Sequence, residues 1–567
     1  MKNNEEYNCM TLIAGKKASA TGHVLVGHNE DDGGTYAVRH GWVPAQDWPA
    51  GTVLPAETGC AAIPQVPHTY GYWWTEVKSP RGGISNADTF LNECGVCIVS
   101  NSMCGSKEPE NPDILTDGGM VYNLRRCLAE RASSARDGAR ILTELMETYG
   151  YAQSGRAYTI ADKDEVFMFQ LMRGKHYMGA RVPDDAVVVM PNHYTLGGLD
   201  DCPETFYPAD LVEYCIQKGW YTPAVPGDYS DFRYAKAVQD PGEWRDRFNT
   251  YRQKFGQYRL LGMDPNVPVF PFCVRTDRKM KPSDFADVLS GHNEGLVPSF
   301  ACFGPGLSIH ETLEYPPICR TTTVESTVFA LTEDIRDTFV FTAFGRPCGL
   351  PYIPLQPLRG LPDVIDPEHT AAARMASHTL PEPDAPAPRD NIETFFWDMA
   401  TLVDLTRCDC FEALRPLMAQ NRREMDELAL SPRPLDGCGG PALAAWQHKL
   451  TGFAEKNIRR IAVEAPDGPI PFEPTRGTFR LVFTCPGQPD PYTLCAGLAH
   501  QSAKSDFSTL FEPESLQKLP DGRYTALFQV RRLRGTVPFP GLYRVFLAGR
   551  TVEGKTFVGP VDLEFRD

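Results

Sequence analysis

The stretch CMTLIAGKKASATGHVLVGHNEDD, residues 9–32, decides the fold. It contains two apolar runs, CMTLIAG at 9–15 and HVLVG at 23–27, joined by the polar segment KKASATG, which ends in glycine. Two short apolar runs around a polar, glycine-containing turn are typical of an antiparallel β-hairpin. We therefore expect the chain to begin its core with a hairpin.

The expected strand register brings reactive side chains together. If Gly15 pairs near His23, antiparallel counting places Cys9 opposite Asn29, within one or two residues. The run HNEDD at His28–Asp32 then lies beside the thiol. A polar turn after a strand is the alternative interpretation of that run.

Cys9 sits where a cysteine can act as both nucleophile and base. Cleavage between Asn8 and Cys9 would free an α-amino group with a reference pKa of about 8, which suits it to accept the thiol proton. The eight residues MKNNEEYN would then be a dispensable propeptide. A buried structural cysteine is the alternative.

Further motifs follow in a fixed order along the chain. They are C-x-T-L-I-x-G-K-K-A-S at 9–19, G-H-N-E-D-D-G-G at 27–34, L-N-E-x-G-V at 91–96, R-V-P-D-D at 181–185, P-N-H-Y-T at 191–195, G-H-N-E-G at 291–295, the stretch 318–326 and G-R-P at 345–347. In this ordered set, the sequence resembles the dipeptidase A family of N-terminal nucleophile cysteine hydrolases, relatives of bile salt hydrolase and penicillin V acylase. The resemblance covers roughly residues 9 to 460.

The resemblance implies roles for five residues. Cys9 would be the nucleophile, Asp31 the carboxylate that holds its free amine, and Asn192 the amide that stabilises the oxyanion. Asn101 would complete that oxyanion hole through its backbone N–H or its side chain. His28 stands where many relatives carry arginine, so a permanent positive charge is replaced by a group that titrates near pH 6.5. A further arginine of the family pattern is not placed by these motifs, and Asn192 has turn initiation after a proline as its alternative.

The same resemblance implies an α+β fold, the four-layer αββα sandwich of the N-terminal nucleophile hydrolases with helical insertions. Pattern and composition divide the chain further. We expect a propeptide at 1–8, the hydrolase domain at 9–462 with one long helix over about 116–147, a largely helical insert at 201–295, strands near 326–331 and 338–344, a proline-rich connector at 380–390, helices packing on the core at 391–462, and an all-β sandwich at 464–567.

Composition limits the classes of function. The net charge of −16 argues against nucleic acid and anionic lipid as partners, because both require basic surface. Seventeen cysteines, an odd number, and a polar N-terminus without a signal sequence favour reduced thiols and the cytoplasm. The chain lacks H-E-x-x-H, and its C-x-x-C at 94–97 has no second pair, so we expect no metal and no cofactor.

These observations predict a cysteine dipeptidase that acts on small peptides through a thioester acyl-enzyme. A linear-amide hydrolase or acyltransferase acting on N-acyl amino acids is the alternative with the same chemistry. A catalytically silent scaffold protein is the alternative of a different class. Homo-oligomer formation stays open.

Overall fold

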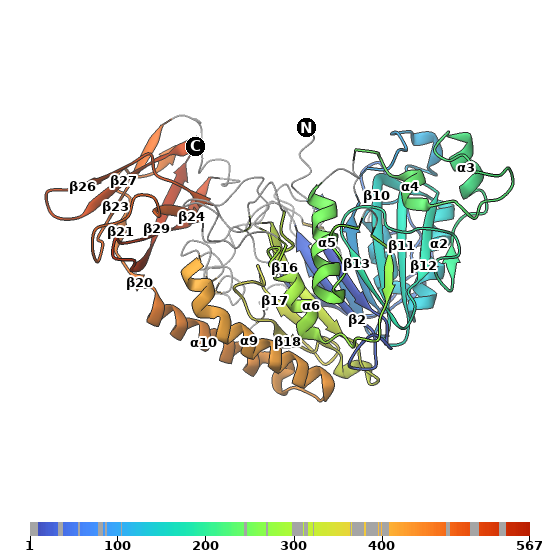
Figure 1. The fold of residues 1–567 in the computed structure, drawn as a ribbon, viewed down its shortest axis with the longest axis horizontal. Helices are drawn as coiled ribbons and strands as arrows, with labels where there is room; N and C mark the ends of the chain where they lie inside the picture. The colour runs from blue at the N-terminus through green and yellow to red at the C-terminus, as the bar shows by residue number, and fades with distance from the viewer. Residues whose placement is uncertain are drawn as a thin grey trace.

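The protein is an α+β structure with two large antiparallel sheets and a separate pair of smaller sheets near the C-terminus (Figure 1). The computed structural model describes residues 9–31, 38–54, 57–76, 83–84, 88–103, 105–242, 247–267, 270–296, 310, 316–320, 322–362, 365, 379–380, 395, 399, 408–471, 477–498, 510–531 and 540–566.

The first large sheet contains the expected hairpin at its centre. Its strands, in spatial order, are β15 (Cys273–Arg275), β13 (Ala186–Met190), β1 (Met10–Ala14), β2 (Leu25–Asp31), β16 (Thr323–Ala330), β17 (Phe339–Ala343) and β18 (Ile353–Leu355). Met10 pairs with Asn29, so Cys9, which directly precedes β1, comes next to Glu30. The register is one residue from the expected pairing.

The second large sheet faces the first sheet across a shared apolar core. Its strands, in spatial order, are β14 (Thr205–Phe206), β12 (Tyr177–Arg181), β11 (Val166–Gly174), β10 (Tyr151–Ala161), β9 (Cys97–Ser102), β8 (Thr89–Asn92), β6 (Tyr72–Glu76) and β3 (Arg39–Val43). Two short pairs stand apart: β4 (Gln46–Asp47) with β5 (His68–Thr69), and β7 (Gly83–Ile84) with β19 (Thr379–Leu380).

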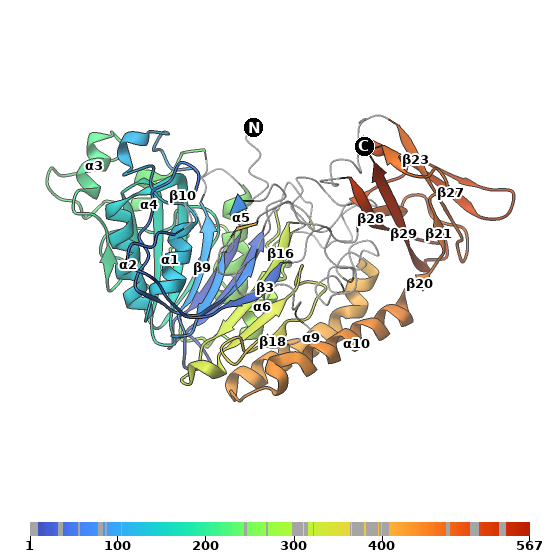
Figure 2. The same ribbon diagram turned by 180° about the vertical axis from the view of Figure 1, so that it is seen from behind.

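Apolar cores fill the space between the sheets and cover both outer faces. Ile13 and Val26 of the first sheet share one core with Val99 and Met168 of the second. The outer face of the second sheet packs on α1 (Asn123–Arg131) and α2 (Ala135–Thr148). The outer face of the first packs on α5 (Arg247–Leu261), α6 (Pro282–Leu289), α9 (Cys408–Leu430) and α10 (Gly440–Asn457). Helices thus lie outside two sheets that face each other (Figures 1 and 2).

A glycine in β2 lets one of these helices approach the sheet. A Cβ atom at Gly27 would lie 3.0 Å from the ring of Phe285 and 3.1 Å from Leu289, both on α6. Cores pack too densely to admit a larger side chain there. The glycine that precedes H-N-E-D-D therefore sets the distance between α6 and the central hairpin.

The single long helix expected over about 116–147 is instead two helices. The first begins only at Asn123 and ends at Arg131, and the second starts after Ser134, whose side chain accepts the N–H of Asp137 as an N-cap. Serine favours helix starts for this reason, so the apolar periodicity runs across a real break.

The segment 201–295, expected to be a largely helical insert, carries both helices and two short strands. The segment has four helices, α3 (Leu211–Gln217), α4 (Tyr234–Val238), α5 and α6, but β14 and β15 also lie in it and extend the edges of the two large sheets. It is therefore part of the main architecture. Of the connector expected at 380–390, Leu380 belongs to β19 and residues 381–390 lie outside the described residues, as does 391–407 of the expected helices apart from positions 395 and 399.

The described part of residues 459–566 contains two sheets that share one core. One sheet has β20 (Arg459–Arg460), β29 (Thr556–Arg566), β28 (Gly541–Arg550), β24 (Cys495–Leu498) and β25 (Leu510–Phe511), with β22 (Ile470–Pro471) beside β29; the other has β21 (Val463–Glu464), β23 (Thr478–Phe483), β27 (Tyr524–Gln529) and β26 (Ser515–Lys518). Phe546 and Val558 join the core around α9 and α10, which tie this unit to the first sheet (Figure 2).

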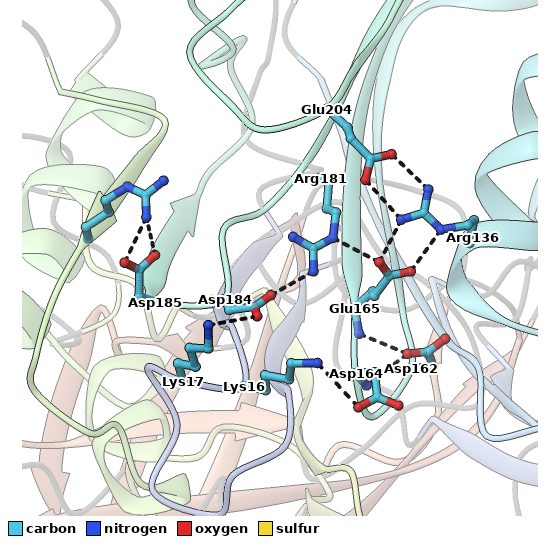
Figure 3. Close-up of polar contacts among 11 residues, drawn as sticks. Lys16, Lys17, Arg136, Asp162, Asp164, Glu165, Arg181, Asp184, Asp185 and Glu204 are labelled. Atoms are coloured by element: carbon cyan, nitrogen blue, oxygen red, sulfur yellow. Dashed lines mark hydrogen bonds and ion pairs between the residues drawn. The ribbon is translucent and has the colours of Figure 1, made fainter.

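Ion pairs join the elements at the end of the sheets opposite Cys9. Arg181 donates to Glu165 Oε1 at 3.0 Å and to Asp184 Oδ1 at 2.7 Å, while Arg136 on α2 binds Glu165 and Glu204 (Figure 3). The motif R-V-P-D-D is therefore explained by structural ion pairs. Short 3₁₀ turns complete the fold at Pro112–Ile114, Ile335–Asp337 and Asp436–Gly439. Within the described part of the chain, every helix is too short or too polar to span a bilayer.

Candidate active site

Cys9 directly precedes β1 and is buried among carboxylates, with 2% of its surface exposed. Its Sγ and the nearest carboxylate oxygens of Glu30 and Asp88 all lie within 4.8 Å of one another, and Sγ lies 3.9 Å from the main-chain oxygen of Asp31. Burial, followed by the charges of Glu30, Asp88 and Asp31, raises the pKa of the thiol well above its ordinary value. The thiol is therefore protonated at neutral pH in this environment.

Two arginines hold the neighbouring carboxylate in its charged form. Asp88 accepts hydrogen bonds from Arg125, Arg156 and the hydroxyl of Ser100, the last at 2.5 Å. Burial alone would raise the pKa of Asp88, but the two guanidinium groups hold it below its ordinary range. Because Asp88 already faces two cations, the trio of Cys9, Glu30 and Asp88 is a poor metal site.

His28 is a neutral hydrogen-bonding residue in this site. Thr11 Oγ1 donates to Asn101 Oδ1 at 2.6 Å and lies 2.9 Å from His28 Nδ1, so Nδ1 carries the ring proton. Burial lowers the pKa of His28 to about 4; the charge of Asp88 opposes this shift and that of Arg156 adds to it. Glu30 Oε2 lies 3.6 Å from Nε2, beyond hydrogen-bond distance. The imidazole therefore does not replace the permanent charge of an arginine.

Asp31 is a buried carboxyl with an elevated proton affinity. Thr323 on β16 donates to Asp31 Oδ1 at 2.5 Å. Burial raises the pKa of Asp31 to about 7, although Arg320, the Thr323 hydroxyl and Arg252 all act to lower it. A further cation beside it would favour the carboxylate.

Asn192 and Arg252 form a unit that reaches the main chain of Cys9. Arg252 on α5 is fully buried and donates from Nη1 to the Cys9 carbonyl oxygen at 3.0 Å and from Nη2 to Asn192 Oδ1 at 2.8 Å. Asn192 Nδ2 donates to Ser102 O at 2.5 Å. The guanidinium fixes which end of the Asn192 amide is oxygen, so the –NH₂ group retains a second proton for a ligand.

Asn101 joins the two large sheets. From β9, its Oδ1 accepts from Thr11 on β1, and its Nδ2 donates to Met190 O at 3.1 Å and to Pro191 O at 3.4 Å. Both ends of its side-chain amide are thus engaged with protein atoms. This arrangement suits a residue that positions Asn192 better than one whose side chain donates to an oxyanion.

The structure brings all five residues singled out from the sequence into one region. Arg252 donates to the Cys9 carbonyl and to Asn192, and its positive charge lowers the pKa of Asp31. His28 and Asn101 both contact the Thr11 hydroxyl. The sequence motifs place no second arginine of the family pattern, and in the structure Arg252 is the guanidinium that contacts Cys9 and Asn192. Arg252 lies 243 residues from Cys9 in the sequence, so no local sequence pattern predicts that the two residues are in contact.

Sequence comparison gives the context for this site. The sequence model of peptidase family C69 matches residues 8–354. Similar proteins include a probable dipeptidase B of Streptococcus pyogenes serotype M6, 24% identical over 372 residues that cover 61% of this chain and 72% of that protein. A probable dipeptidase of Latilactobacillus sakei is 23% identical over 362 residues, covering 61% and 73%.

Solved structures that resemble this chain include two enzymes of low similarity. Penicillin V acylase from Agrobacterium tumefaciens has a TM-score of 0.28 and 9% identity, covering 59% of this chain and 83% of that chain. A mutant of conjugated bile acid hydrolase from Clostridium perfringens has a TM-score of 0.23 and 12% identity, covering 59% and 88%.

Proposed function

Because the chain belongs to peptidase family C69, we propose that it is a cysteine dipeptidase whose nucleophile is Cys9 after removal of residues 1–8. The relatives named probable dipeptidases support peptide hydrolysis. The geometry supports the cysteine mechanism. The arrangement of helices outside two facing sheets is, in this proposal, the αββα sandwich of the N-terminal nucleophile hydrolases. Location in the cytoplasm stays a prediction from the cysteines and the polar N-terminus.

The hydrogen bond from Arg252 to the Cys9 carbonyl is the observation that carries the proposal. It fixes the backbone of Cys9 from one side, while the main-chain oxygen of Asp31 lies 3.9 Å from the thiol and the Asp31 carboxyl is buried. Cleavage of the Asn8–Cys9 bond would place a new amino group at this point. The amine gives Asp31 a cation and gives the thiol a base of suitable pKa.

The reaction then proceeds by acyl transfer. The Cys9 amine accepts the thiol proton, and the thiolate attacks the carbonyl carbon of the peptide bond. The Asn192 amide donates its second N–H to the oxyanion, a contribution usually worth 10²–10³ in rate. The ammonium returns a proton to the leaving amine, and water hydrolyses the thioester to release the second product.

His28 and Asn101 act as positioning residues in this scheme. Thr11 joins them, and Asn101 also holds the main chain just before Asn192. Glu30 and Asp88 oppose formation of the thiolate. A positive charge on Cys9 itself offsets these carboxylates, which is a reason for the amine to arise on the nucleophile.

The N-terminal residue of the purified protein tests the proposal. We expect intact mass to show a chain that starts at Cys9 and that releases amino acids from dipeptides. Cys9→Ala should keep residues 1–8 and hydrolyse nothing, whereas Cys60→Ala, at a partly buried cysteine in a turn, should match wild type. Active protein that still carries Met1 would refute the amine-as-base mechanism.

The alternatives are separated by substrate and by labelling. Turnover of N-acyl amino acids with none of any dipeptide would identify a linear-amide hydrolase. A thiol-reactive probe that fails to label Cys9 in folded protein would favour a silent scaffold.

A further inference from the structure

Four residues of the classes that bind metals meet on the helix side of the first sheet, and Cys9 is not among them. They are His292 in the loop after α6, His310, Cys319 just before β16, and Cys348 after β17. One ligand atom of each, two imidazole nitrogens and two sulfurs, lies within 4.8 Å of all the others. The first three side chains are buried, and Cys348 is partly buried.

The spacing of these atoms suits a tetrahedral metal ion. With bond lengths of about 2.3 Å to sulfur and 2.0–2.1 Å to nitrogen, tetrahedral zinc separates its ligand atoms by about 3.3–3.8 Å. The four atoms need to close by only about an ångström to reach that geometry. His310 Nε2 and Cys348 Sγ already lie 3.2 Å apart, and the two imidazole rings have centroids 4.9 Å apart.

The backbone holds three of these loops together without the ion. The N–H of Cys319 donates to Gly291 O at 3.1 Å, next to His292. The Ser290 hydroxyl donates to Pro347 O at 3.1 Å, next to Cys348. Hydrogen bonds therefore hold the segments that carry His292, Cys319 and Cys348 close together, as a preorganised metal site requires.

A carboxylate faces one of the histidines from outside the cluster. Glu294 Oε1 lies 3.4 Å from His292 Nδ1. Zinc-binding histidines commonly present their second ring nitrogen to a carboxylate, which orients the ring and strengthens the ligand. Nε2 of His292 is then the ligand atom.

We propose that His292, His310, Cys319 and Cys348 bind one Zn²⁺ ion in a structural Cys₂His₂ site. Two thiolates with two imidazoles are a zinc set, and four protein ligands leave no position for water or substrate. The ion would therefore not take part in peptide hydrolysis. This replaces the expectation, drawn from local motifs, that the chain binds no metal.

The site would fix a loop that reaches Asp31. Cys319 lies four residues before Thr323, which donates to the Asp31 carboxyl. The N–H of Arg320 donates to Thr323 Oγ1 at 2.9 Å, so the residue after Cys319 is tied to Thr323. Zinc at Cys319 would stabilise this link, and its loss would lower stability more than it changes the chemistry.

Metal content, measured on full-length protein without any activity assay, tests the proposal. Protein purified without a metal-affinity tag and dialysed against a weak chelator should retain about one zinc per chain by mass spectrometry of the elements. Cys348→Ser and His310→Ala should lose it. The double variant Cys202→Ser/Cys273→Ser removes another neighbouring cysteine pair and should keep it.

Wild-type protein provides a second readout that does not depend on how the variants fold. Apoprotein titrated with Co²⁺ should take up one equivalent and develop the thiolate charge-transfer and strong d–d bands of a tetrahedral S₂N₂ site. Absence of zinc together with no stoichiometric Co²⁺ uptake would overturn the proposal. So would a Cys319–Cys348 disulfide found by peptide mapping in protein isolated under reducing conditions.

Discussion

The substitution His28→Asn should make the protein less sensitive to acid by an amount that the structure defines. Burial lowers the pKa of His28 to about 4, against 6.5 for an exposed imidazole, so the unfolded state binds the proton more tightly. Its contribution to stability is complete above pH 6.5 and is lost as the pH falls through 6.5 toward 4. From pH 7.5 to pH 5, linkage gives a loss of about 2 kcal/mol in the free energy of unfolding.

Asparagine is the informative replacement because its –NH₂ group can donate to Thr11 in place of Nδ1. Urea unfolding of wild type and variant at pH 7.5 and pH 5 would measure the two changes in free energy, and the variant should lose about 2 kcal/mol less. His448→Asn, at an exposed position on α10, is the matched control and should follow wild type. Equal losses in wild type and His28→Asn would show that His28 is not held neutral by burial.

Three further perturbations test other parts of the molecule. Arg252→Lys should lower kcat/KM by about 10²-fold with an unchanged circular dichroism spectrum, because an ammonium cannot hold both Asn192 and the Cys9 carbonyl; unchanged kcat/KM would contradict this. Gly27→Val should destabilise the protein by about 1–3 kcal/mol in urea unfolding, because its methyl groups would overlap Phe285. Truncation after residue 462 should lower the melting temperature, because it exposes the apolar surface of α10, but should leave turnover per folded molecule unchanged; a loss of turnover would place the C-terminal unit in the reaction.

Much of the fold was predictable wherever the pattern was local. The hairpin of β1 and β2 lies within one residue of the expected register because the turn and the apolar alternation fix it together. The family resemblance drawn from the ordered motifs is confirmed by the match to residues 8–354. The break before α2 was missed because Ser134 caps a helix inside an apolar periodicity that continues on both sides.

The features that the sequence did not predict depend on contacts between residues distant in sequence. Strands β14 and β15 are two and three residues long, so they carry no readable alternation, and only pairing with the sheet edges defines them. Arg252 meets Cys9 and Asn192 from 243 and 60 residues away in the sequence. The histidines and cysteines of the proposed zinc site are separated by 9 to 29 residues, beyond the spacing of local metal motifs.

Alternation along β2 divides its polar run between two faces of the sheet. His28 and Glu30 point into the space between the sheets, toward Thr11 and the thiol, while Asn29 and Asp31 point to the helix side. Asn29 Nδ2 donates to the main-chain oxygen at the end of α6 at 2.9 Å. The four residues are therefore not one cluster, and a slip of one residue would exchange their roles.

Cys9 makes contacts on both faces of the first sheet, so the space between the sheets and the outer helix layer both define its position. Its thiol faces the carboxylates between the sheets, while its carbonyl is held by Arg252 from the outer helix layer. Asp31, the proposed partner of the amine, is held on the outer side by Thr323, in the segment that follows Cys319. In the proposed mechanism, the attacking sulfur and the carboxyl that orients its base are thus positioned by different layers. A disturbance of the loop at Cys319 would therefore act on the Asp31 carboxyl and not on the thiol.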